Sequence, residues 1–411
     1  IANSEANAAA MASGCKQAGR DCLVAMKSMG LHVASDALSV GNFANPGEPM
    51  KDPETGEMVS PGVVVTVGDD PWSLSTSTPA DSRFLFKHLH IPFLEPSTPQ
   101  ELKDWMKHAL WISRRTSLYQ GVLLTTFMAE GGGRVELSEH APVSKEAVTL
   151  DPSHFDLSKN VMVPPNSCLA DQTMIQERFP KVREALKRLN LDQTFGPERP
   201  ESQVKLGFLT SGVIFETLKQ VMEEGDYLSR YPLYKVACSY PLIEDFILPW
   251  LSQLDHVVIV EEKRGFLEAE ISELAQKHGL SLTIYGKSFI DQNGETKEGF
   301  PAYGGLSYEI VRDKVGEVLK DLGETACAEL FHPSSQWEES FPKRLPTFCP
   351  GCPHRETLSL LKELRKSLKR KGVDLITHGD VGCYSLSFLP PFKEMHNLSA
   401  MGQGGALGAG L

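Results

Sequence analysis

The sequence of 411 residues contains no apolar run that approaches the ~20 residues needed to cross a bilayer. It also lacks a dense basic cluster, and 53 acidic residues outnumber 41 Lys and Arg for a net charge of -12. These features predict neither a membrane-spanning protein nor one with a nucleic-acid partner. The first residues, 1–14, lack the basic and apolar regions of a secretory signal, so we expect a soluble, cytoplasmic protein.

Cysteine is scarce as well, because eight cysteines are too few for a disulfide scaffold in a chain of this length. Five of them have no partner at metal-ligand spacing and are expected to be small buried hydrophobic residues, namely Cys15, Cys22, Cys168, Cys238 and Cys327. The other three, Cys349, Cys352 and Cys383, form the informative set. The composition is otherwise that of a globular protein, and the length predicts about three domains.

Strand and helix patterns alternate in two long stretches. The first has a short buried strand expected at 21–27, further strands at 61–68, 91–96 and 121–127, and helices at 5–19, 78–89 and 98–115. We expect Thr98 to cap the last of these helices and Pro99 to occupy its first position. The second has expected strands at 204–212, 234–241, 255–262 and 281–286, with helices at 212–224, 242–253, 267–279 and 306–321. Strands separated by helices of this length predict an α/β fold with doubly wound parallel sheets, which bind ligands at the carboxyl ends of their strands.

The same patterns suggest domain boundaries. We expect domains at 1–130, 204–325 and 326–411, with a linker segment at 131–203 that holds one helix near 171–189. The third domain is expected to contain, in order, a loop, an amphipathic helix, a strand at 373–378 and a Gly-rich turn. The chain begins without Met and stops within a Gly/Ala helix opening, so we expect it to be part of a longer chain.

The strongest chemical signal is the segment CPGCPH at 349–354, followed by GDVGC at 379–383. A C-x-x-C pair on a tight turn holds two thiolates within reach of one metal or iron–sulfur corner, and Cys383 could supply a third ligand. Two alternatives stay open: zinc with His354 as fourth ligand, and three reduced thiols without metal. A thioredoxin-like redox pair fits poorly, because the prolines and Cys383 are foreign to that motif.

Two further segments have the pattern of a diphosphate and cofactor site. Asp380 and the amides of Gly382 and Cys383 follow the expected strand at 373–378, and MGQGGALGAGL at 401–411 would let backbone N–H groups approach an anion. A close helix–helix contact would explain the same glycines. Glu5 precedes an Ala-rich helix and could share a proton with the aminopyrimidine of thiamine diphosphate, although locally it is more typical of a helix N-terminal charge.

Taken in order, these segments resemble a known family. SEANAAAMASG, VVVTVGDDPWSLSTSTPADSR, LPTFCPGCPHR, GDVGCYSL and MGQGGALGAGL are similar to the α subunit of indolepyruvate:ferredoxin oxidoreductases, within the thiamine-diphosphate-dependent 2-oxoacid:ferredoxin oxidoreductase superfamily. The resemblance implies that 1–130 binds the pyrimidine of thiamine diphosphate, that 204–325 resembles the transketolase C-terminal domain, and that 326–411 is the first part of a diphosphate-binding domain.

The resemblance also assigns roles to residues. Glu5 matches the activating glutamate. The cofactor would be bound by His354, Asp380, Gly382, Cys383, Tyr384, Met401, Gly402, Gln403 and Gly404. Cys349, Cys352 and Cys383 match three ligands of a [4Fe-4S] cluster, and both its fourth ligand and the ligands of Mg2+ are expected beyond residue 411.

The activity implied is oxidative decarboxylation of an arylpyruvate, indolepyruvate or phenylpyruvate, to the aryl-acetyl-CoA and CO2. Electrons would pass through iron–sulfur clusters to ferredoxin or another acceptor, and a β subunit is the expected partner. Two alternatives remain: a non-oxidative thiamine diphosphate 2-oxoacid decarboxylase, which needs no cysteine cluster, and a catalytically silent scaffold subunit.

Overall fold

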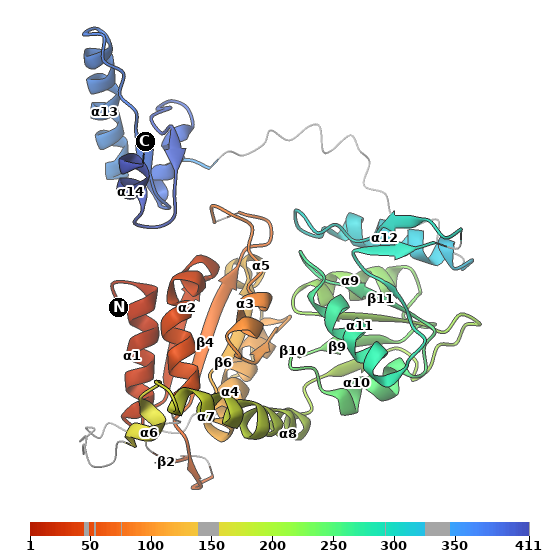
Figure 1. The fold of residues 1–411 in the computed structure, drawn as a ribbon. Helices are drawn as coiled ribbons and strands as arrows, with labels where there is room; N and C mark the ends of the chain where they lie inside the picture. The colour runs from red at the N-terminus through yellow and green to blue at the C-terminus, as the bar shows by residue number, and fades with distance from the viewer. Residues whose placement is uncertain are drawn as a thin grey trace. The chain divides into compact units, whose positions relative to one another are not determined.

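The computed structural model describes residues 1–44, 49–52, 55–74, 76–138, 156–291, 293–324 and 346–410. The chain forms two compact units, Ile1–Leu330 and Phe331–Leu411. The first unit contains two mainly parallel sheets with helices on both faces, so the predicted α/β fold class is confirmed (Figure 1). Within the described ranges, no helix combines the length and the apolar character needed to span a bilayer.

The first sheet has five strands. Its spatial order is β1 (Cys22–Lys27), β4 (Val63–Asp69), β6 (Gln120–Thr125), β5 (Phe93–Leu94) and β10 (Cys238–Tyr240). The first four strands run parallel, and β10 pairs antiparallel with β5 at the edge. Their carboxyl ends therefore meet along one edge of the sheet, where the sequence predicts ligand binding.

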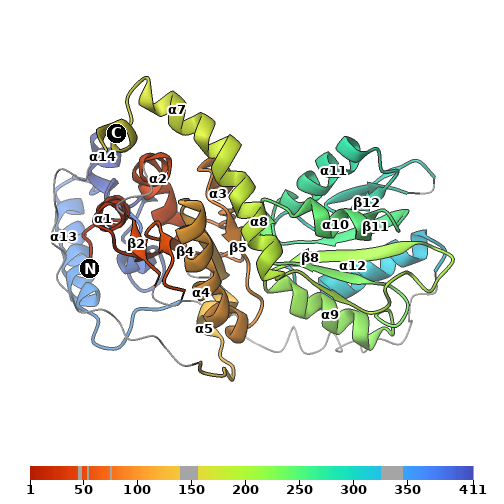
Figure 2. The same ribbon diagram turned by 90° about the horizontal axis from the view of Figure 1, so that it is seen from below.

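Helices cover both faces of this sheet because its strands are apolar on both sides. Val63, Val65 and Val67 of β4 pack in one core with α1 (Glu5–Gln17), α2 (Ser28–Phe43) and α3 (Arg83–His88). Val64 faces the opposite core, which contains α4 (Pro99–Thr116) and α8 (Phe179–Leu189), side by side in Figure 2. Such two-sided burial explains the run of β-branched residues in β4.

The predicted start of α4 is confirmed. The Thr98 hydroxyl accepts a hydrogen bond from the Glu101 amide at 3.1 Å, and Pro99 occupies the first helical position. Along the sequence between β6 and the strands of the second sheet, the chain forms α5 (Thr126–Glu130), α6 (Leu157–Asn160), α7 (Asn166–Thr173), a π-helical turn at Met174–Arg178 and α8. The helix predicted near 171–189 is therefore present and begins earlier.

The second sheet has the spatial order β12 (Thr283–Tyr285), β11 (His256–Val260), β8 (Leu206–Ser211), β9 (Leu233–Val236) and β7 (Gln193–Phe195). Only β7 is antiparallel to its neighbour. One face packs against α9 (Ile214–Glu224) and α12 (Tyr308–Asp321), and the other against α10 (Glu244–Leu251) and α11 (Phe266–His278). Two small hairpins complete the unit, β2 (Met50–Lys51) with β3 (Met58–Val59) and β13 (Ser288–Ile290) with β14 (Thr296–Glu298).

Three strand predictions need correction, two of them in the first unit. The single strand expected at 234–241 is two strands in different sheets, because the chain leaves the second sheet after β9 and pairs β10 with β5 of the first. One short segment thus joins the two sheets. The strand at 21–27 is not buried, since β1 lies at a sheet edge and Leu23 is 57% exposed.

The second unit consists of α13 (Pro353–Lys369), β15 (His378–Gly379), a 3-10 helix (Cys383–Phe388), β16 (Asn397–Leu398) and α14 (Gly404–Ala409). The strand predicted at 373–378 is wrong in extent, because only His378 and Gly379 pair, in parallel, with β16. Val373 and Ile376 are 50% and 61% exposed. In the described part of this unit neither a partner strand nor an apolar surface holds residues 373–377 in a sheet.

Candidate functional site

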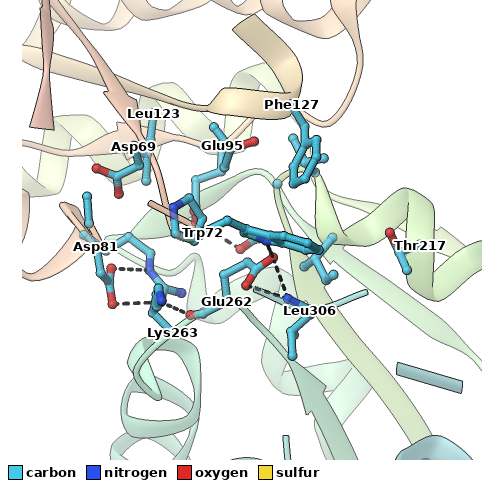
Figure 3. A pocket seen from close by; sticks show the side chains of 18 of the residues that line it. Asp69, Trp72, Asp81, Glu95, Leu123, Phe127, Thr217, Glu262, Lys263 and Leu306 are labelled. Atoms are coloured by element: carbon cyan, nitrogen blue, oxygen red, sulfur yellow. Dashed lines mark hydrogen bonds and ion pairs between the residues drawn. The ribbon is translucent and has the colours of Figure 1, made fainter. Parts of the chain in front are cut away.

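A cavity of about 320 Å3 lies where strands of both sheets end (Figure 3). Asp69 closes β4, Leu123 and Thr125 belong to the end of β6, and Ser211 ends β8. Glu262 follows β11. The cavity therefore combines the carboxyl edges of two parallel sheets, the place where such sheets bind ligands.

Aromatic side chains form one wall. Trp72 and Phe127 meet edge to face with ring centroids 5.1 Å apart. The Trp72 indole donates to Glu262 Oε1 at 3.3 Å, and the Leu306 amide donates to Glu262 Oε2 at 3.1 Å. Burial raises the pKa of Glu262. A Cβ at Gly305 would lie 1.5 Å from Trp72 Nε1, so only glycine at this position lets the indole stay where it is.

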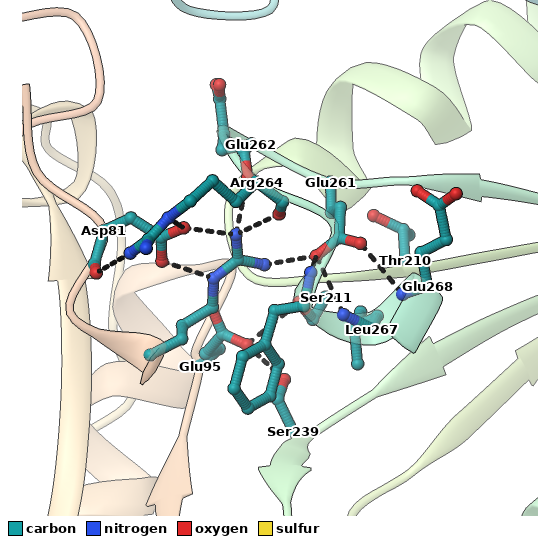
Figure 4. Close-up of polar contacts among 12 residues, drawn as sticks. Asp81, Glu95, Thr210, Ser211, Ser239, Glu261, Glu262, Arg264, Leu267 and Glu268 are labelled. Carbon is teal, nitrogen blue, oxygen red and sulfur yellow. Dashed lines mark hydrogen bonds and ion pairs between the residues drawn. The ribbon is translucent and has the colours of Figure 1, made fainter. Parts of the chain in front are cut away.

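A buried arginine pairs with carboxylates from elements of both sheets beside the cavity, and Figure 4 labels two of these partners, Asp81 and Glu261. Arg83 at the start of α3 donates to both carboxylate oxygens of Asp81, at 2.9 and 3.1 Å, and to Glu261 at 2.5 Å. It also donates to the carbonyl oxygens of Glu262 and Arg264, at 2.6 and 3.0 Å. Because Arg83 belongs to the first sheet's helices and Glu261 follows β11, this pair fixes one side of the cavity.

Glu261 has a second role in the same cluster. Its carboxylate accepts hydrogen bonds from the amides of Phe266, Leu267 and Glu268, each at 3.0 Å. These are the first amides of α11, which lack partners within the helix. Glu261 therefore caps α11 and neutralises Arg83 at once.

Two more buried carboxyl groups line the cavity. Glu95, after β5, accepts hydrogen bonds from Ser211 Oγ at 3.0 Å and from Ser239 Oγ, and burial raises its pKa. Asp69 accepts from the amide and hydroxyl of Ser82 at 2.7 and 2.5 Å. Burial raises the pKa of Asp69 to about 6.

The loop at 70–82 connects this cavity to the neighbourhood of Glu5. Asp70 organises the loop by accepting hydrogen bonds from the amides of Leu74 and Thr76, both at 2.9 Å. Farther along, Ser77 Oγ lies 3.5 Å from the sulfur of Met29 in α2. The loop therefore runs along the carboxyl edge of the first sheet from the cavity toward α2.

Glu5 lies at this edge as well. It is the first residue of α1, and its N-cap Ser4 accepts a hydrogen bond from the Asn7 amide at 3.2 Å. Its side chain packs directly against Gly30 of α2, because a Cβ added at Gly30 would lie 2.5 Å from Glu5 Cγ and 3.1 Å from Glu5 Oε1. Since α2 directly follows β1, this contact places the Glu5 carboxylate near the carboxyl end of β1.

In the second unit several of the predicted cofactor-binding residues lie together. The rings of His354 and Tyr384 pack edge to face at 5.7 Å. A Cβ at Gly404 would lie 3.1 Å from the carbonyl carbon of Gly379, so α14 begins directly against the end of β15, next to Asp380. Gly382 accommodates the ring of Tyr384, which would lie 2.5 Å from a Cβ there.

The remaining residues of that prediction flank α14. Gly402 has a left-handed φ of 72°, and the Gln403 amide donates to the carbonyl of Ala400 at 3.0 Å. Met401 lies between these turn residues and is half-buried. The glycines of this segment therefore allow a tight turn and a close contact between helix and strand. Their role in binding a diphosphate stays a prediction.

The three informative cysteines lie on two separate pieces of backbone. Cys349 and Cys352 flank a tight turn in which the Cys352 amide donates to the Cys349 carbonyl at 3.2 Å and Gly351 has a φ of 72°. Cys383 begins the 3-10 helix. Among the described residues, which include all three, no three Cys, His, Asp or Glu side chains gather as metal ligands. The [4Fe-4S] cluster stays a prediction, and no step below depends on it.

The other cysteines behave differently from the expectation of burial. Cys238 is buried, but Cys168 is exposed on α7, a helix that buries none of its residues. Cys15 and Cys22 are half-buried and share a thiol–thiol hydrogen bond, and burial together with Cys15 raises the pKa of Cys22 to about 11. Cys327 lies outside the described residues.

Sequence reasoning missed the residues of the cavity. Trp72, Arg83, Glu95 and Lys263 were not singled out, although Trp72 and Lys263 lie shortly after predicted strands and Glu95 lies near the end of one. The runs DDPW and EEK after two apolar strands were the available signal, since polar residues at the carboxyl ends of parallel strands are candidates for ligand binding.

Comparisons with known proteins agree with the resemblance seen in the sequence. Residues 200–331 match the family profile described as Indolepyruvate oxidoreductase domain. The Indolepyruvate oxidoreductase subunit IorA of Methanothermobacter marburgensis is 28% identical over 399 residues, which cover 97% of this chain and 57% of that protein. The IorA subunit of Thermococcus kodakarensis is 27% identical over 403 residues, covering 96% and 56%. The chain thus spans a little over half the length of these relatives.

A solved structure shares the fold. The 2-oxoglutarate:ferredoxin oxidoreductase from Magnetococcus marinus, with 2-oxoglutarate, coenzyme A and succinyl-CoA bound, superimposes with a TM-score of 0.52 at 15% sequence identity. The match covers 77% of this chain and 56% of that chain. It supports the α/β architecture of both sheets.

Proposed function

We propose, from its confirmed resemblance to the IorA subunits of indolepyruvate oxidoreductases, that this chain is the thiamine diphosphate-binding part of a 2-oxoacid:ferredoxin oxidoreductase. The observation that carries the proposal is the alignment of 97% of the chain with such a subunit. The geometry of Glu5 supports it, because its carboxylate lies at the carboxyl edge of a parallel sheet, over a glycine that makes room for it.

Thiamine diphosphate, when bound, supplies the carbon nucleophile and the electron sink for decarboxylation of a 2-oxoacid. In this proposal Glu5 would face the aminopyrimidine, and its carboxylate would share a proton with the ring nitrogen. Gly30 holds no side chain that would displace Glu5. The segments around Asp380, Gly382 and Gly402–Gly404 would contact the diphosphate, and Mg2+ would be bound by ligands outside this chain. The domain boundaries inferred from the sequence, 1–130, 204–325 and 326–411, belong to the same proposal.

The finer proposal is that the substrate is an arylpyruvate and the product its aryl-acetyl-CoA, with electrons delivered to ferredoxin. The name of the relatives supports indolepyruvate as the substrate class, and the solved structure of a related fold contains a 2-oxoacid and coenzyme A. A β subunit is the proposed partner, since the relatives are named as one subunit of an oxidoreductase.

The proposal is tested on the intact protein assembled with its β subunit. Indolepyruvate, phenylpyruvate and pyruvate are compared with and without coenzyme A, and reduction of ferredoxin is followed by its visible spectrum. We expect reduction that requires coenzyme A and is fastest with an arylpyruvate. Release of CO2 without any electron acceptor would instead identify a non-oxidative decarboxylase, and failure to bind thiamine diphosphate in calorimetry would identify a silent scaffold.

A further inference from the structure

We propose that the cavity between the two sheets binds the carboxylate of a small aromatic acid, with Lys263 as the cationic partner. Lys263 follows β11 and lines the cavity in Figure 3. It is only 7% exposed, and no described residue accepts a hydrogen bond from its ammonium or forms an ion pair with it. The ammonium nitrogen itself stays accessible, so a carboxylate that enters the cavity would reach it and form an ion pair with it.

Carboxylates lie near Lys263, but they are used elsewhere. The negative charges of Glu262, Asp81 and Asp70 act to raise the pKa of Lys263 without forming an ion pair with it. Glu262 accepts hydrogen bonds from Trp72 and the Leu306 amide, Asp81 is paired with Arg83, and Asp70 holds the loop at 70–82. Desolvation by burial nevertheless lowers the pKa of Lys263, so the neighbouring charges do not replace the water that the ammonium has lost.

The start of α9 adds a second feature that favours an anion. Gly212, Val213 and Ile214 line the same cavity, and α9 extends over 11 residues without a side-chain cap at its N-terminus. Gly212 has a left-handed φ of 60°, which turns the chain from β8 into the helix. The Phe215 and Glu216 amides already donate to the carbonyl oxygens of Gly212 and Val213, both at 3.1 Å, so this helix start favours an anion through the positive end of its dipole.

The apolar part of the cavity indicates an aromatic ligand. Trp72 and Phe127 offer ring surfaces, and Leu123 and Ile214 complete the apolar lining. A volume of about 320 Å3 is at the small end of the range of roughly 300–1,000 Å3 for ligand sites, so it suits a small acid. The choice of aromatic acids rests on the proposed function, and both an arylpyruvate substrate and an arylacetate have the required carboxylate.

The test measures binding to the intact protein by calorimetry, with phenylpyruvate, phenylacetate and the neutral phenylacetamide as probes. We expect at least one acid to bind more tightly than the amide. Lys263→Gln should weaken the binding of that acid at least tenfold and leave the affinity for the amide unchanged. Lys181→Gln, at an exposed lysine of α8, is the matched control and should change nothing. Binding of phenylpyruvate alone would assign the site to the 2-oxoacid, and binding of both acids to aromatic carboxylates in general.

A second variant separates binding from folding. Lys263→Met removes the unpartnered ammonium, so we expect its thermal midpoint to equal or exceed that of the wild type while the acid no longer binds. A lower midpoint, equal affinity for acid and amide, or acid binding that persists in Lys263→Gln would overturn the inference. Because binding is measured without turnover, failure of arylpyruvate oxidation would contradict the proposed function and leave this result unchanged.

Discussion

At the scale of single residues, the contact between Glu5 and Gly30 is the most specific feature linked to the proposed chemistry. A Cβ at position 30 would meet Glu5 Cγ at 2.5 Å and the Cβ of Met26 at 3.1 Å, so the carboxylate could not keep its place. Sequence reasoning identified Glu5 through the resemblance. It could not identify Gly30, because the need for glycine arises only when α1 and α2 pack together.

We therefore predict that Gly30→Ala lowers turnover of the assembled enzyme by roughly 10- to 100-fold, the usual consequence of a displaced catalytic group. The matched control is Gly14→Ala, since an added Cβ at Gly14 in α1 meets nothing within 4 Å. Steady-state kinetics with an arylpyruvate and thermal unfolding would be measured on both variants. Equal turnover in Gly30→Ala and the wild type would show that the position of Glu5 does not matter.

The raised pKa of Asp69 predicts a pH dependence of stability. Its pKa rises from an ordinary 3.8 to about 6 because the carboxyl group is buried. Between these values the folded state binds more protons than the unfolded state, so the free energy of unfolding should fall as pH increases from about 4 to 6. This rise in pKa already includes the effect of the Ser82 hydrogen bonds, and it corresponds to at most about 3 kcal/mol.

Chemical denaturation at pH 4, 5, 6 and 7 would measure this slope in the wild type and in Asp69→Asn. The variant has no proton to bind at this position, so its stability should depend less on pH in that window. If both proteins showed the same slope, Asp69 would not titrate as its burial implies.

At the scale of elements, the sequence predicted most helices and strands in order because each has a clear periodicity. It missed α2, between the strands predicted at 21–27 and 61–68, and the helix predicted at 78–89 begins only at Arg83. The N-cap of α4 was predicted from Thr98 and Pro99 alone, and both act as expected. The division of 234–241 between two sheets was missed, since an apolar run does not reveal which neighbour it pairs with. The strand at 373–378 failed for a related reason, as strand formation depends on a partner strand elsewhere in the chain.

The ion pair between Arg83 and Glu261 joins elements that contribute to different sheets, and it is the contact that we expect to matter most for their packing. Arg83→Ala would leave Glu261 buried without its partner, which typically costs about 3–5 kcal/mol. Arg83→Lys should recover only part of this loss because lysine lacks the planar fork of donors. Urea unfolding, followed through the transition of the first unit, would measure these losses in the free energy of unfolding.

Arg264→Ala is the control for that experiment. The Arg264 side chain is 58% exposed and pairs with the same Asp81 at 3.5 Å. Exposed ion pairs contribute about 1 kcal/mol or less, so this variant should stay close to the wild type. Comparable losses in Arg83→Ala and Arg264→Ala would mean that the buried pair has no special role in joining the sheets.

At the scale of the whole molecule, the sequence predicted the fold class and the resemblance to a family, because ordered motifs persist over nearly the whole chain. It did not predict the cavity between the sheets. That cavity requires β10 to cross from one sheet to the other, and it brings together residues from 69 to 308 whose proximity no local pattern records. Sites of this kind depend on tertiary packing, whereas motifs such as CPGCPH are visible in a few consecutive residues.

The most direct test of the proposed chemistry is hydrogen–deuterium exchange at the reactive thiazolium carbon of thiamine diphosphate, followed by NMR in the assembled protein. A charge-assisted hydrogen bond contributes about 1.5–3 kcal/mol, so Glu5→Gln should slow this exchange by roughly tenfold or more while the protein stays folded. Exchange at the wild-type rate in Glu5→Gln, with the cofactor bound, would contradict the assignment of Glu5 as the residue that activates it.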